Sequence, residues 1–249
     1  MNPRKLMMIK ELRSATSASI KLCRESLEES DYDFDKALKV LRDRLGAVLI
    51  NSKRDRASDF SKVFVASEEG KAAMLTLKTE TDFALKSEAF LQIGEALSKI
   101  ALKNEVSRAE DLNCQESYHQ RLLYATKLGE NMVVHDIQLA KGPVISSYVH
   151  GDALGCVVVL EKGSASDAYK LAVQSVGYKA KFVDALCPAF KEDMVSKANL
   201  REDEIEAFVN NLAERYVLTE QTCYFSPSQT VGEFIASKGI VIAKILRNF

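Results

Sequence analysis

The spacing of apolar residues changes from a helical to a strand period after residue 50, and this change constrains the fold most strongly. Residues 1–50 carry apolar side chains at helical spacing in three short segments, which are separated by Ser14–Ser19 and by Ser30–Asp33. Both separators are rich in residues that favour helix caps over helix interiors. The charged run Ser52–Arg56 follows. We therefore expect a small three-helix bundle over 1–50 and a linker at Ser52–Arg56.

Beyond residue 57 the chain follows one scheme twice, a β-hairpin and then an amphipathic helix. The first hairpin spans Val63–Leu77 and turns at Glu69–Gly70, and the second hairpin spans 144–160. The helix after the second hairpin is expected over Ser164–Gly177. The long helix after the first hairpin is expected to carry one apolar stripe, formed by Phe83, Phe90, Leu91, Ile93, Leu97 and Ile100. This recurrence predicts a duplicated hairpin-plus-helix α+β core.

The rest of the chain completes this scheme. Between the two copies we expect a helix over Asn113–Lys127 and a strand over Val133–Leu139. The elements expected after the second copy are a short projecting helical segment at about 191–222, a break at Ser226–Ser228, a helix over Thr230–Lys238 and a closing strand over Ile240–Leu246. The domains that follow from this pattern are 1–50, 57–142 and 143–249, the last including the projecting segment.

The composition argues against several classes of protein. The formal net charge of −1 gives no basic field for direct binding of nucleic acid. The five cysteines are odd in number and contain no CxxC pair, so we expect no disulfide framework or zinc site, and Cys23 is expected to be a core thiol. No apolar run approaches the roughly 18 residues that a membrane span needs. We therefore expect no membrane partner.

No motif in the sequence predicts an active site. The phosphate-binding loops GxxxxGK[ST] and GxGxxG are absent, as are HExxH and GxSxG. The three histidines, His119, His135 and His150, are scattered without the spacing of metal ligands. We therefore expect no catalytic residue, no metal and no cofactor. A small enzyme with an unrecognised site in the α+β core is kept as one alternative.

The stretch Thr79–Lys86 is the most informative part of the sequence, because a strand passes into a helix there. Thr81 or Asp82 can cap the start of the helix, and Asp82 also complements the positive end of the helix dipole. Phe83 allows two interpretations. It can close the helix start as a hydrophobic staple, or it can be offered to a partner as an aromatic anchor.

Several motifs resemble those of one family and occur in that family's order. Thr81-Asp82-Phe83, with Lys86 and Phe90 behind it, resembles the TDFVAK signature of the elongation factor Ts family. Further similar segments are Ile9–Thr16 in the first bundle, Gly129–Asn131, Ser147–Gly151 and Pro227–Gly232. The first bundle is also similar to that family's ubiquitin-associated-type (UBA-like) domain. The resemblance runs from residue 9 to residue 247 and covers nearly the whole chain.

The resemblance implies a guanine nucleotide exchange factor for the GTPase elongation factor Tu, rather than an enzyme. Such a factor promotes GDP release and GTP loading during translation elongation, by displacing Mg²⁺ and disturbing the nucleotide site. The residues that the resemblance assigns to binding of elongation factor Tu are Asp82, Phe83, Thr81, Arg13, Ile20, Lys21 and His150. Asp82 and Phe83 would push into the GTPase domain, while the N-terminal bundle would grip another face of it.

Two departures from the family pattern bear on the compartment and on the N-terminal grip. Thr16–Ser19 stands where the family usually has TGAG, and the loss of both glycines narrows the conformations open to this turn. The segment 191–222 is shorter than the coiled-coil hairpin of many bacterial members. These features favour a protein of the mitochondrial matrix in its processed form, with the bacterial cytoplasm as the alternative. The alternative function is a UBA-type binding module, residues 1–50, fused to an unrelated α+β domain.

Overall fold

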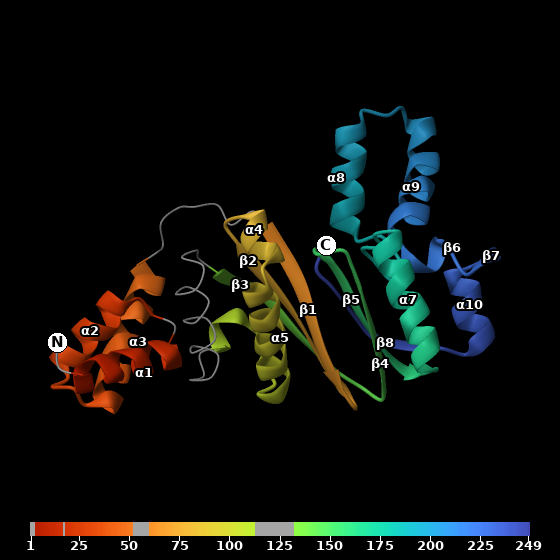
Figure 1. Cartoon of the computed structure of the whole chain (residues 1–249). Coiled ribbons are helices and arrows are strands. Elements are labelled where there is room, and N and C mark those ends of the chain that lie inside the picture. Colours follow the sequence, from red (N-terminus) through yellow and green to blue (C-terminus); the bar gives the residue numbers. More distant parts are fainter. Residues whose placement is uncertain (1–2, 17, 52–59, 113–131) are drawn as a thin grey trace. The chain divides into compact units, whose positions relative to one another are not determined.

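The computed structural model describes residues 3–16, 18–51, 60–112 and 132–249. They belong to two compact units, one made of Met1–Phe64 with Leu75–Ile137 and the other of Val65–Met74 with Gln138–Phe249. The helix predicted over Asn113–Lys127 and the Gly129–Asn131 motif lie outside the described residues. The fold is α+β as predicted, with helices first and antiparallel sheets with helices after them (Figure 1). The division into three domains stays a prediction.

The N-terminal part forms the predicted three-helix bundle of α1 (Pro3–Thr16), α2 (Ile20–Glu29) and α3 (Phe34–Asn51). Ser19 begins α2, because its side-chain oxygen accepts a hydrogen bond from the backbone N–H of Leu22 at 3.2 Å. Buried side chains join the helices in one core, formed by Ile9, Leu12, Ala18, Cys23, Leu27, Ala37 and Leu41. Cys23 is fully buried, which confirms the predicted core thiol.

The first predicted hairpin is present. β1 (Phe60–Glu68) and β2 (Lys71–Thr79) are joined at Glu69–Gly70, where Gly70 has a φ of 77°, a conformation that glycine adopts without steric cost. The predicted strand that follows is β3 (Met132–Lys141), and the three strands form a sheet of order β1-β2-β3. β2 is buried at every position of Ala72–Leu77, so both of its faces are covered.

The long helix predicted after this hairpin is interrupted. The structure has a one-turn helix, α4 (Asp82–Lys86), and a longer one, α5 (Glu88–Lys103), which Ser87 separates with an extended backbone (φ −69°, ψ 143°). A short 3-10 helix, η1 (Ala109–Asp111), follows. The predicted stripe is buried at Phe90, Ile93, Leu97 and Ile100 and half-buried at Leu91. It was wrong for Phe83, which is exposed because Ser87 ends the helical register between the two segments.

The second copy of the scheme lies in the second unit. β4 (Val144–His150) and β5 (Leu154–Lys162) pair antiparallel, and β8 (Val241–Arg247) pairs with the other side of β5. α7 (Ala165–Gly177) packs on β4 and β5 and begins with a capping box between Ser164 and Asp167. The core of this unit includes Val158, Leu160, Leu171, Val176, Val231 and Phe234.

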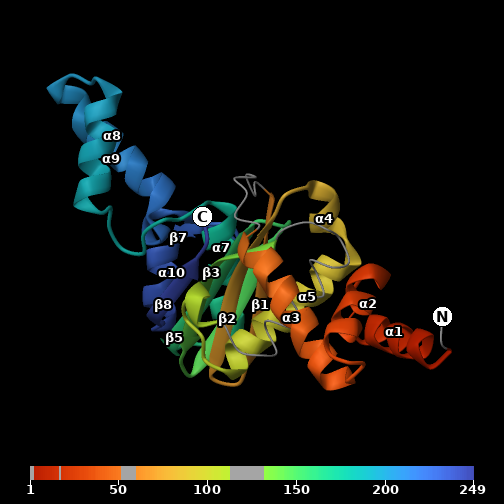
Figure 2. The same ribbon diagram turned by 90° about the vertical axis from the view of Figure 1, so that its left-hand side faces the viewer.

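The second unit contains a projecting helical hairpin, formed by α8 (Pro188–Ala198) and α9 (Glu202–Tyr216) (Figure 2). Its bounds differ from the predicted 191–222. Pro188 occupies the first turn of α8, where proline needs no backbone donor, and Asn199 ends the helix in a left-handed conformation with a φ of 49°. No helix among the residues that the structure describes is long and apolar enough to cross a membrane.

The chain after α9 contains η2 (Leu218–Glu220), β6 (Thr222–Cys223), β7 (Ser226–Thr230) and α10 (Val231–Lys238). The predicted break at Ser226–Ser228 holds in that no helix crosses it, although these residues form the start of β7. Pro227 is tolerated there since β7 belongs to a two-stranded ribbon with β6 and is an edge strand. The helix α10 and the closing strand β8 confirm the predictions for this part of the chain.

Candidate functional site

The one-turn helix α4 is capped by Thr81, one of the two residues, Thr81 or Asp82, that the sequence offered as its cap. Thr81 has an extended backbone (φ −129°, ψ 157°), and its Oγ1 accepts a hydrogen bond from the backbone N–H of Ala84 at 3.2 Å. The Thr81 carbonyl also accepts a bond from the Leu85 N–H at 3.2 Å. The Thr81 side chain therefore satisfies one backbone donor that a helix start leaves unpaired, and its carbonyl accepts the first hydrogen bond within the helix.

Ser87 closes α4 and opens α5. Its hydroxyl donates a hydrogen bond to the Ala84 carbonyl at 2.7 Å, and the same oxygen accepts one from the Phe90 N–H at 3.2 Å. The sequence did not predict this junction, because the apolar spacing continues across it. Ser87 therefore sets α4 apart as a separate turn between β2 and α5.

Phe83 is the most exposed of the large apolar residues that the structure describes, with 82% of its surface in water. The residues that follow it, Ala84 and Leu85, are buried at 3% and 7% exposure and fasten the turn to the fold. Burying a phenylalanine side chain stabilises a protein by about 1.5–3 kcal/mol, and the free chain lacks this stabilisation at Phe83. The interpretation of Phe83 as a staple is wrong, and an aromatic anchor for a partner fits its exposure.

Asp82 lies beside Phe83 in the first turn of α4. Its Oδ2 is 3.1 Å from the Lys86 Nζ, four residues along the chain, and both side chains are open to solvent. An exposed pair at this spacing contributes only about 0.3–0.5 kcal/mol, so a partner can replace it at little cost. Asp82 therefore presents an available carboxylate next to the exposed ring.

The helix behind the tip is firmly packed. Phe90 is fully buried in α5, and its ring centroid lies 5.8 Å from that of Phe64 in β1. A Cβ placed on Gly94 would come within 2.2 Å of the Phe64 ring, so the absence of a side chain at Gly94 makes room for this ring. α4 thus projects its exposed residues from a rigid base.

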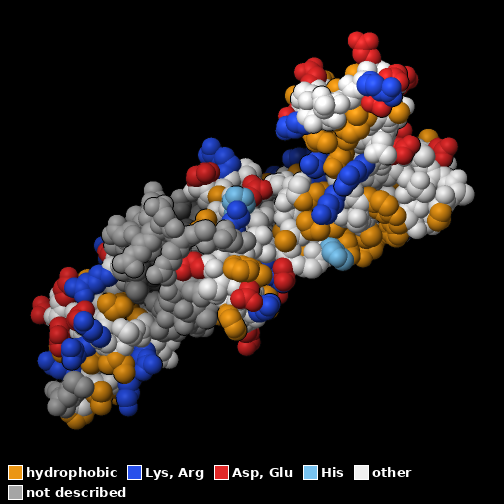
Figure 3. Space-filling view, turned by 90° about the horizontal axis from the view of Figure 1, so that it is seen from above, with side chains coloured by type: hydrophobic (Ala, Val, Ile, Leu, Met, Phe, Trp, Pro, Cys, Tyr) orange, Lys and Arg blue, Asp and Glu red, His pale blue; other side chains and the backbone are white. Residues whose placement is uncertain are grey.

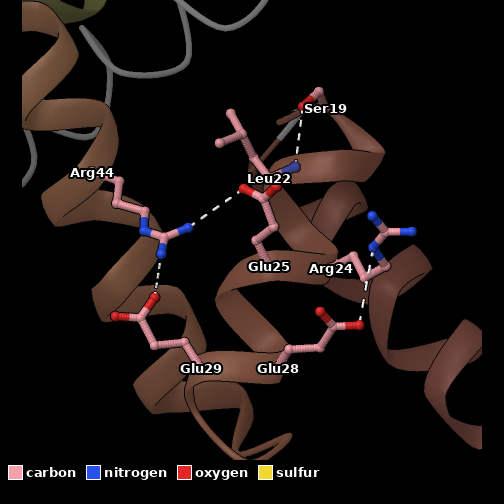
Figure 4. Close-up of polar contacts among 7 residues, drawn as sticks. All are labelled: Ser19, Leu22, Arg24, Glu25, Glu28, Glu29 and Arg44. Carbon is pink, nitrogen blue, oxygen red and sulfur yellow. Dashed lines mark hydrogen bonds and ion pairs between the residues drawn. The ribbon is translucent and has the colours of Figure 1, made fainter.

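Three further predicted residues lie at the junction of α1 and α2. Arg13 is exposed in the last turn of α1, while Ile20 and Lys21 are exposed in the first turn of α2, with 57% of Ile20 in water. Ser19, which caps α2, and the ion pairs that join α2 to Arg44 of α3 hold this part of the bundle (Figure 4). The junction therefore offers one exposed apolar side chain and two exposed cations.

Hydrogen bonds from side chains close the turn between these helices. The Thr16 hydroxyl donates to the Leu12 carbonyl at 2.6 Å and accepts from the Ala18 N–H at 3.4 Å. The Cys23 Sγ lies 3.8 Å from the Ala18 carbonyl, and burial raises the pKa of this thiol. Neither Ala18 nor Ser19 has a positive φ, so the described part of the turn does not need the glycines that are missing from the sequence.

His150 ends β4 on the second unit and is exposed at the hairpin turn. Its Nδ1 lies 3.1 Å from the Tyr148 hydroxyl, which lies two residues away on the same face of the strand. Gly151, with a φ of 58°, starts the turn. The sequence did not predict that other aromatic residues gather beside this pair, since Tyr169 and Tyr224 come from distant parts of the chain.

The predicted site residues thus lie on three segments: the α1–α2 junction, the tip of α4 and the end of β4. They offer exposed apolar, cationic and carboxylate groups suited to binding a protein surface. Within the described ranges, no group of three or more His, Cys, Asp or Glu side chains could hold a metal ion.

Comparison with known proteins gives a consistent result. The family model described as Elongation factor TS matches residues 80–248. The chain is 30% identical to elongation factor Ts of Shewanella frigidimarina over 96% of this chain and 88% of that protein. It is 29% identical to elongation factor Ts of Photobacterium profundum, over 96% of this chain and 89% of that protein. The matched residues include the tip of α4, the end of β4 and the whole α+β part that follows them.

Proposed function

The chain belongs to the elongation factor Ts family, and we propose that the tip of α4, Asp82 with Phe83, causes the release of nucleotide from its partner. The chain is a nucleotide exchange factor for elongation factor Tu in translation elongation, and it is not an enzyme. A UBA-type module fused to an unrelated α+β domain does not hold, because the family match covers the α+β part at 80–248.

Exchange of this kind follows from linked equilibria. A protein that binds the nucleotide-free GTPase more tightly than the GDP-bound form must weaken GDP binding by the same factor. Mg²⁺ bridges the phosphates to the GTPase, so any displacement of this ion removes part of the hold on the nucleotide. The exchange factor needs only contacts that the GDP-bound state cannot accept, and no covalent step.

Phe83 provides such a contact in this proposal. The exposed ring inserts between helices of elongation factor Tu beside its nucleotide site and disturbs the position of Mg²⁺. The observation that carries the proposal is the 82% exposure of Phe83 on a turn whose neighbours Ala84 and Leu85 are buried. Burial of the ring in the complex recovers the hydrophobic free energy that the free chain forgoes.

Thr81 and Asp82 support this insertion. Thr81 fixes the first turn of α4 through its hydrogen bond to the Ala84 N–H, and thereby sets the direction of the Phe83 side chain. Asp82 exchanges its weak pair with Lys86 for a donor on the partner. Thr81 and Asp82 therefore both act at the place where the Phe83 ring inserts.

The remaining predicted residues anchor the complex elsewhere. The exposed Arg13, Lys21 and Ile20 all lie at the α1–α2 junction, a combination that fits an apolar depression with an acidic rim on elongation factor Tu. His150 contacts the partner from the second unit. These contacts increase the affinity for elongation factor Tu, while the α4 tip causes the release of its nucleotide.

For the compartment, we propose the mitochondrial matrix. The relatives named above are bacterial, and the bacterial cytoplasm is the alternative. The support is the shorter helical projection and the turn at Thr16–Ser19 without glycine. Fractionation of the source cells with an antibody against the chain tests this proposal. Recovery with matrix markers supports it, and recovery from a bacterial cytosol contradicts it.

The exchange proposal is tested by stopped-flow release of a fluorescent GDP analogue from the cognate elongation factor Tu. We expect the wild-type chain to accelerate release strongly and Phe83→Ala to lower the maximal rate at saturating chain by at least about tenfold. Phe60→Ala, which removes a ring that is 39% exposed at the start of β1, is the control and should match the wild type. Equal rates for Phe83→Ala and Phe60→Ala would move the working contact away from α4.

A further inference from the structure

We propose that Ser87 is a positioning residue for nucleotide exchange, because its hydroxyl keeps the turn that carries Phe83 out of the register of the following helix. This role rests on the proposed function and deepens it, since it names the group that holds the ring in its exposed position. Ser87 lies between α4 and α5 and acts on the partner only through Phe83. It is not one of the residues that the family resemblance assigns to binding of elongation factor Tu.

The sequence would place Phe83 on the buried side of one continuous helix. Phe83, Phe90 and Leu97 are spaced by seven residues, which turn an α-helix through about 700°, about 20° short of two full turns. Phe90 and Leu97 are both fully buried in α5. A helix that ran unbroken over 82–103 would therefore turn Phe83 toward the side that α5 buries.

The observed surface at Phe83 differs from this expectation. In Figure 3, hydrophobic side chains reach the surface in patches among polar and charged ones. Phe83 is 82% exposed, whereas the next two residues, Ala84 and Leu85, are buried. Because burial of an aromatic ring is favourable, a local interaction has to hold Phe83 away from the side that α5 buries.

The Ser87 hydroxyl forms two hydrogen bonds that interrupt the helix. It donates to the Ala84 carbonyl at 2.7 Å and accepts from the Phe90 N–H at 3.2 Å. In a continuous helix, the Ala84 carbonyl would accept from the Glu88 N–H and the Phe90 N–H would donate to the Lys86 carbonyl. The hydroxyl thus engages two of the backbone groups that a continuous helix would pair at this point.

The same hydroxyl links the turn to the packed part of α5. Phe90 is fully buried, and its ring centroid lies 5.8 Å from that of Phe64. The two hydrogen bonds of Ser87 join the Phe90 backbone to the Ala84 carbonyl, which lies next to Phe83. The position of the Phe83 ring is therefore set before a partner binds, which lowers the cost of ordering it in the complex.

The test is a series of variants at Ser87 in the full chain. Each is assayed by release of a fluorescent GDP analogue from the cognate elongation factor Tu and by urea unfolding. Ser87→Ala removes the donor and the acceptor, and Ser87→Thr keeps both. Ser87→Asp keeps an acceptor for the Phe90 N–H but, as an ionised carboxylate, has no donor for the Ala84 carbonyl. The series therefore separates the cap of α5 from the closure of α4.

We expect Ser87→Ala to lower the maximal release rate at saturating chain at least about fivefold, because a displaced group loses most of its effect on the nucleotide site. Ser87→Asp should lower this rate by a similar factor and keep the wild-type midpoint of urea unfolding, since it still caps α5. Ser87→Thr should match the wild type in both measurements. A wild-type maximal rate for Ser87→Ala or Ser87→Asp would overturn the proposal.

Two effects other than positioning are controlled. Repulsion by the added carboxylate of Ser87→Asp raises the half-saturating concentration and weakens with salt, but it leaves the maximal rate unchanged. Thr230→Ala removes the acceptor for the Glu233 N–H at the start of α10, so it should lower the urea midpoint without changing the maximal rate. An equal fall in the maximal rate for Thr230→Ala would show that lost stability slows release, and the proposal would be wrong.

A double-mutant cycle shows whether Ser87 acts through Phe83. In the Phe83→Ala chain, Ser87→Ala should cause no further fall in the maximal rate, and an additional fall would contradict the proposal. Failure of the proposed function is seen separately. If Phe83→Ala alone keeps the full maximal rate, the wedge mechanism is wrong. If Phe83→Ala lowers the rate and Ser87→Ala does not, only the role of Ser87 is wrong.

Discussion

At the residue scale, the exposure of Phe83 is maintained by its neighbours. Thr81 caps the turn through the Ala84 N–H, and Ala84 and Leu85 are buried below it. The ring therefore stays in water although about 1.5–3 kcal/mol favours its burial. The sequence predicted a cap at Thr81 or Asp82, because both residue types favour helix starts. It did not decide between the two roles of Phe83, because a hydrophobic staple and an aromatic anchor need the same residue type.

The cap at Thr81 gives a direct prediction. Thr81→Ala removes the acceptor for the Ala84 N–H and should lower the free energy of unfolding by about 1 kcal/mol. Because the turn then holds Phe83 less firmly, the maximal rate of GDP release should fall as well. Urea unfolding and stopped-flow release measure the two effects. Thr81→Ser keeps the acceptor and should restore both, whereas a Thr81→Ala chain that equals the wild type in both assays rules out this role.

Asp167 makes stability depend on pH. Its hydrogen bonds with the Ser164 side chain and backbone lower the pKa of this carboxyl below the unfolded value of about 3.9. A lowered pKa in the folded state means that the contribution is fully present well above pH 4 and is lost as the pH falls through the folded pKa. Stability measured by urea unfolding between about pH 5 and pH 3 should therefore fall less steeply in Asp167→Asn. Identical slopes for the two proteins would show that the capping carboxylate is not responsible.

At the scale of elements, the sequence predicted the helices and strands better than their junctions. Ser19, Ser164 and Thr230 begin helices with side-chain caps, as residues of their type are expected to do. The junction at Ser87 could not be predicted from apolar spacing, since Phe90 and later positions keep the helical period. The contact of Tyr148 with Tyr169 depends on packing between β4 and α7, and no local pattern encodes it.

The packing of α5 on β1 gives the next prediction. A methyl group added at Gly94 would lie 2.2 Å from the Phe64 ring, which is itself only 7% exposed and has little room to move. Gly94→Ala should therefore destabilise the fold by about 1–3 kcal/mol, as overpacked cores do. Thermal unfolding measures the loss, and Phe64→Leu in the same chain should recover part of it. A Gly94→Ala chain as stable as the wild type would mean that the core around α5 is loosely packed.

At the scale of the whole molecule, the division into 1–50, 57–142 and 143–249 stays a prediction from the sequence. The charged run Ser52–Arg56 contains Lys53, Arg54 and Arg56, all substrates for trypsin. If it links two domains, limited trypsin digestion should cut there first and release two stable fragments. Mass spectrometry of the early fragments identifies the site. A first cut within 191–222 would instead place the most accessible backbone in the helical projection.

In the proposed mechanism, several surfaces provide affinity for elongation factor Tu and one turn causes the loss of nucleotide. The assignment of Asp82 and Phe83 rests on the family resemblance together with the exposure of the ring, and the anchoring residues share only the resemblance and their solvent-exposed positions. A chain in which every contact served affinity alone would bind elongation factor Tu equally well with and without GDP and would shift no equilibrium.

The most direct test of this claim is the ratio of two dissociation constants, for GDP-bound and for nucleotide-free elongation factor Tu, measured by titration calorimetry with the wild type and with Phe83→Ala. We expect the wild type to bind the nucleotide-free form much more tightly. We also expect Phe83→Ala to bring the two constants together, mainly by weakening binding to the nucleotide-free form. If Phe83→Ala weakens both forms equally and leaves the ratio unchanged, Phe83 contributes only affinity and the wedge mechanism is contradicted.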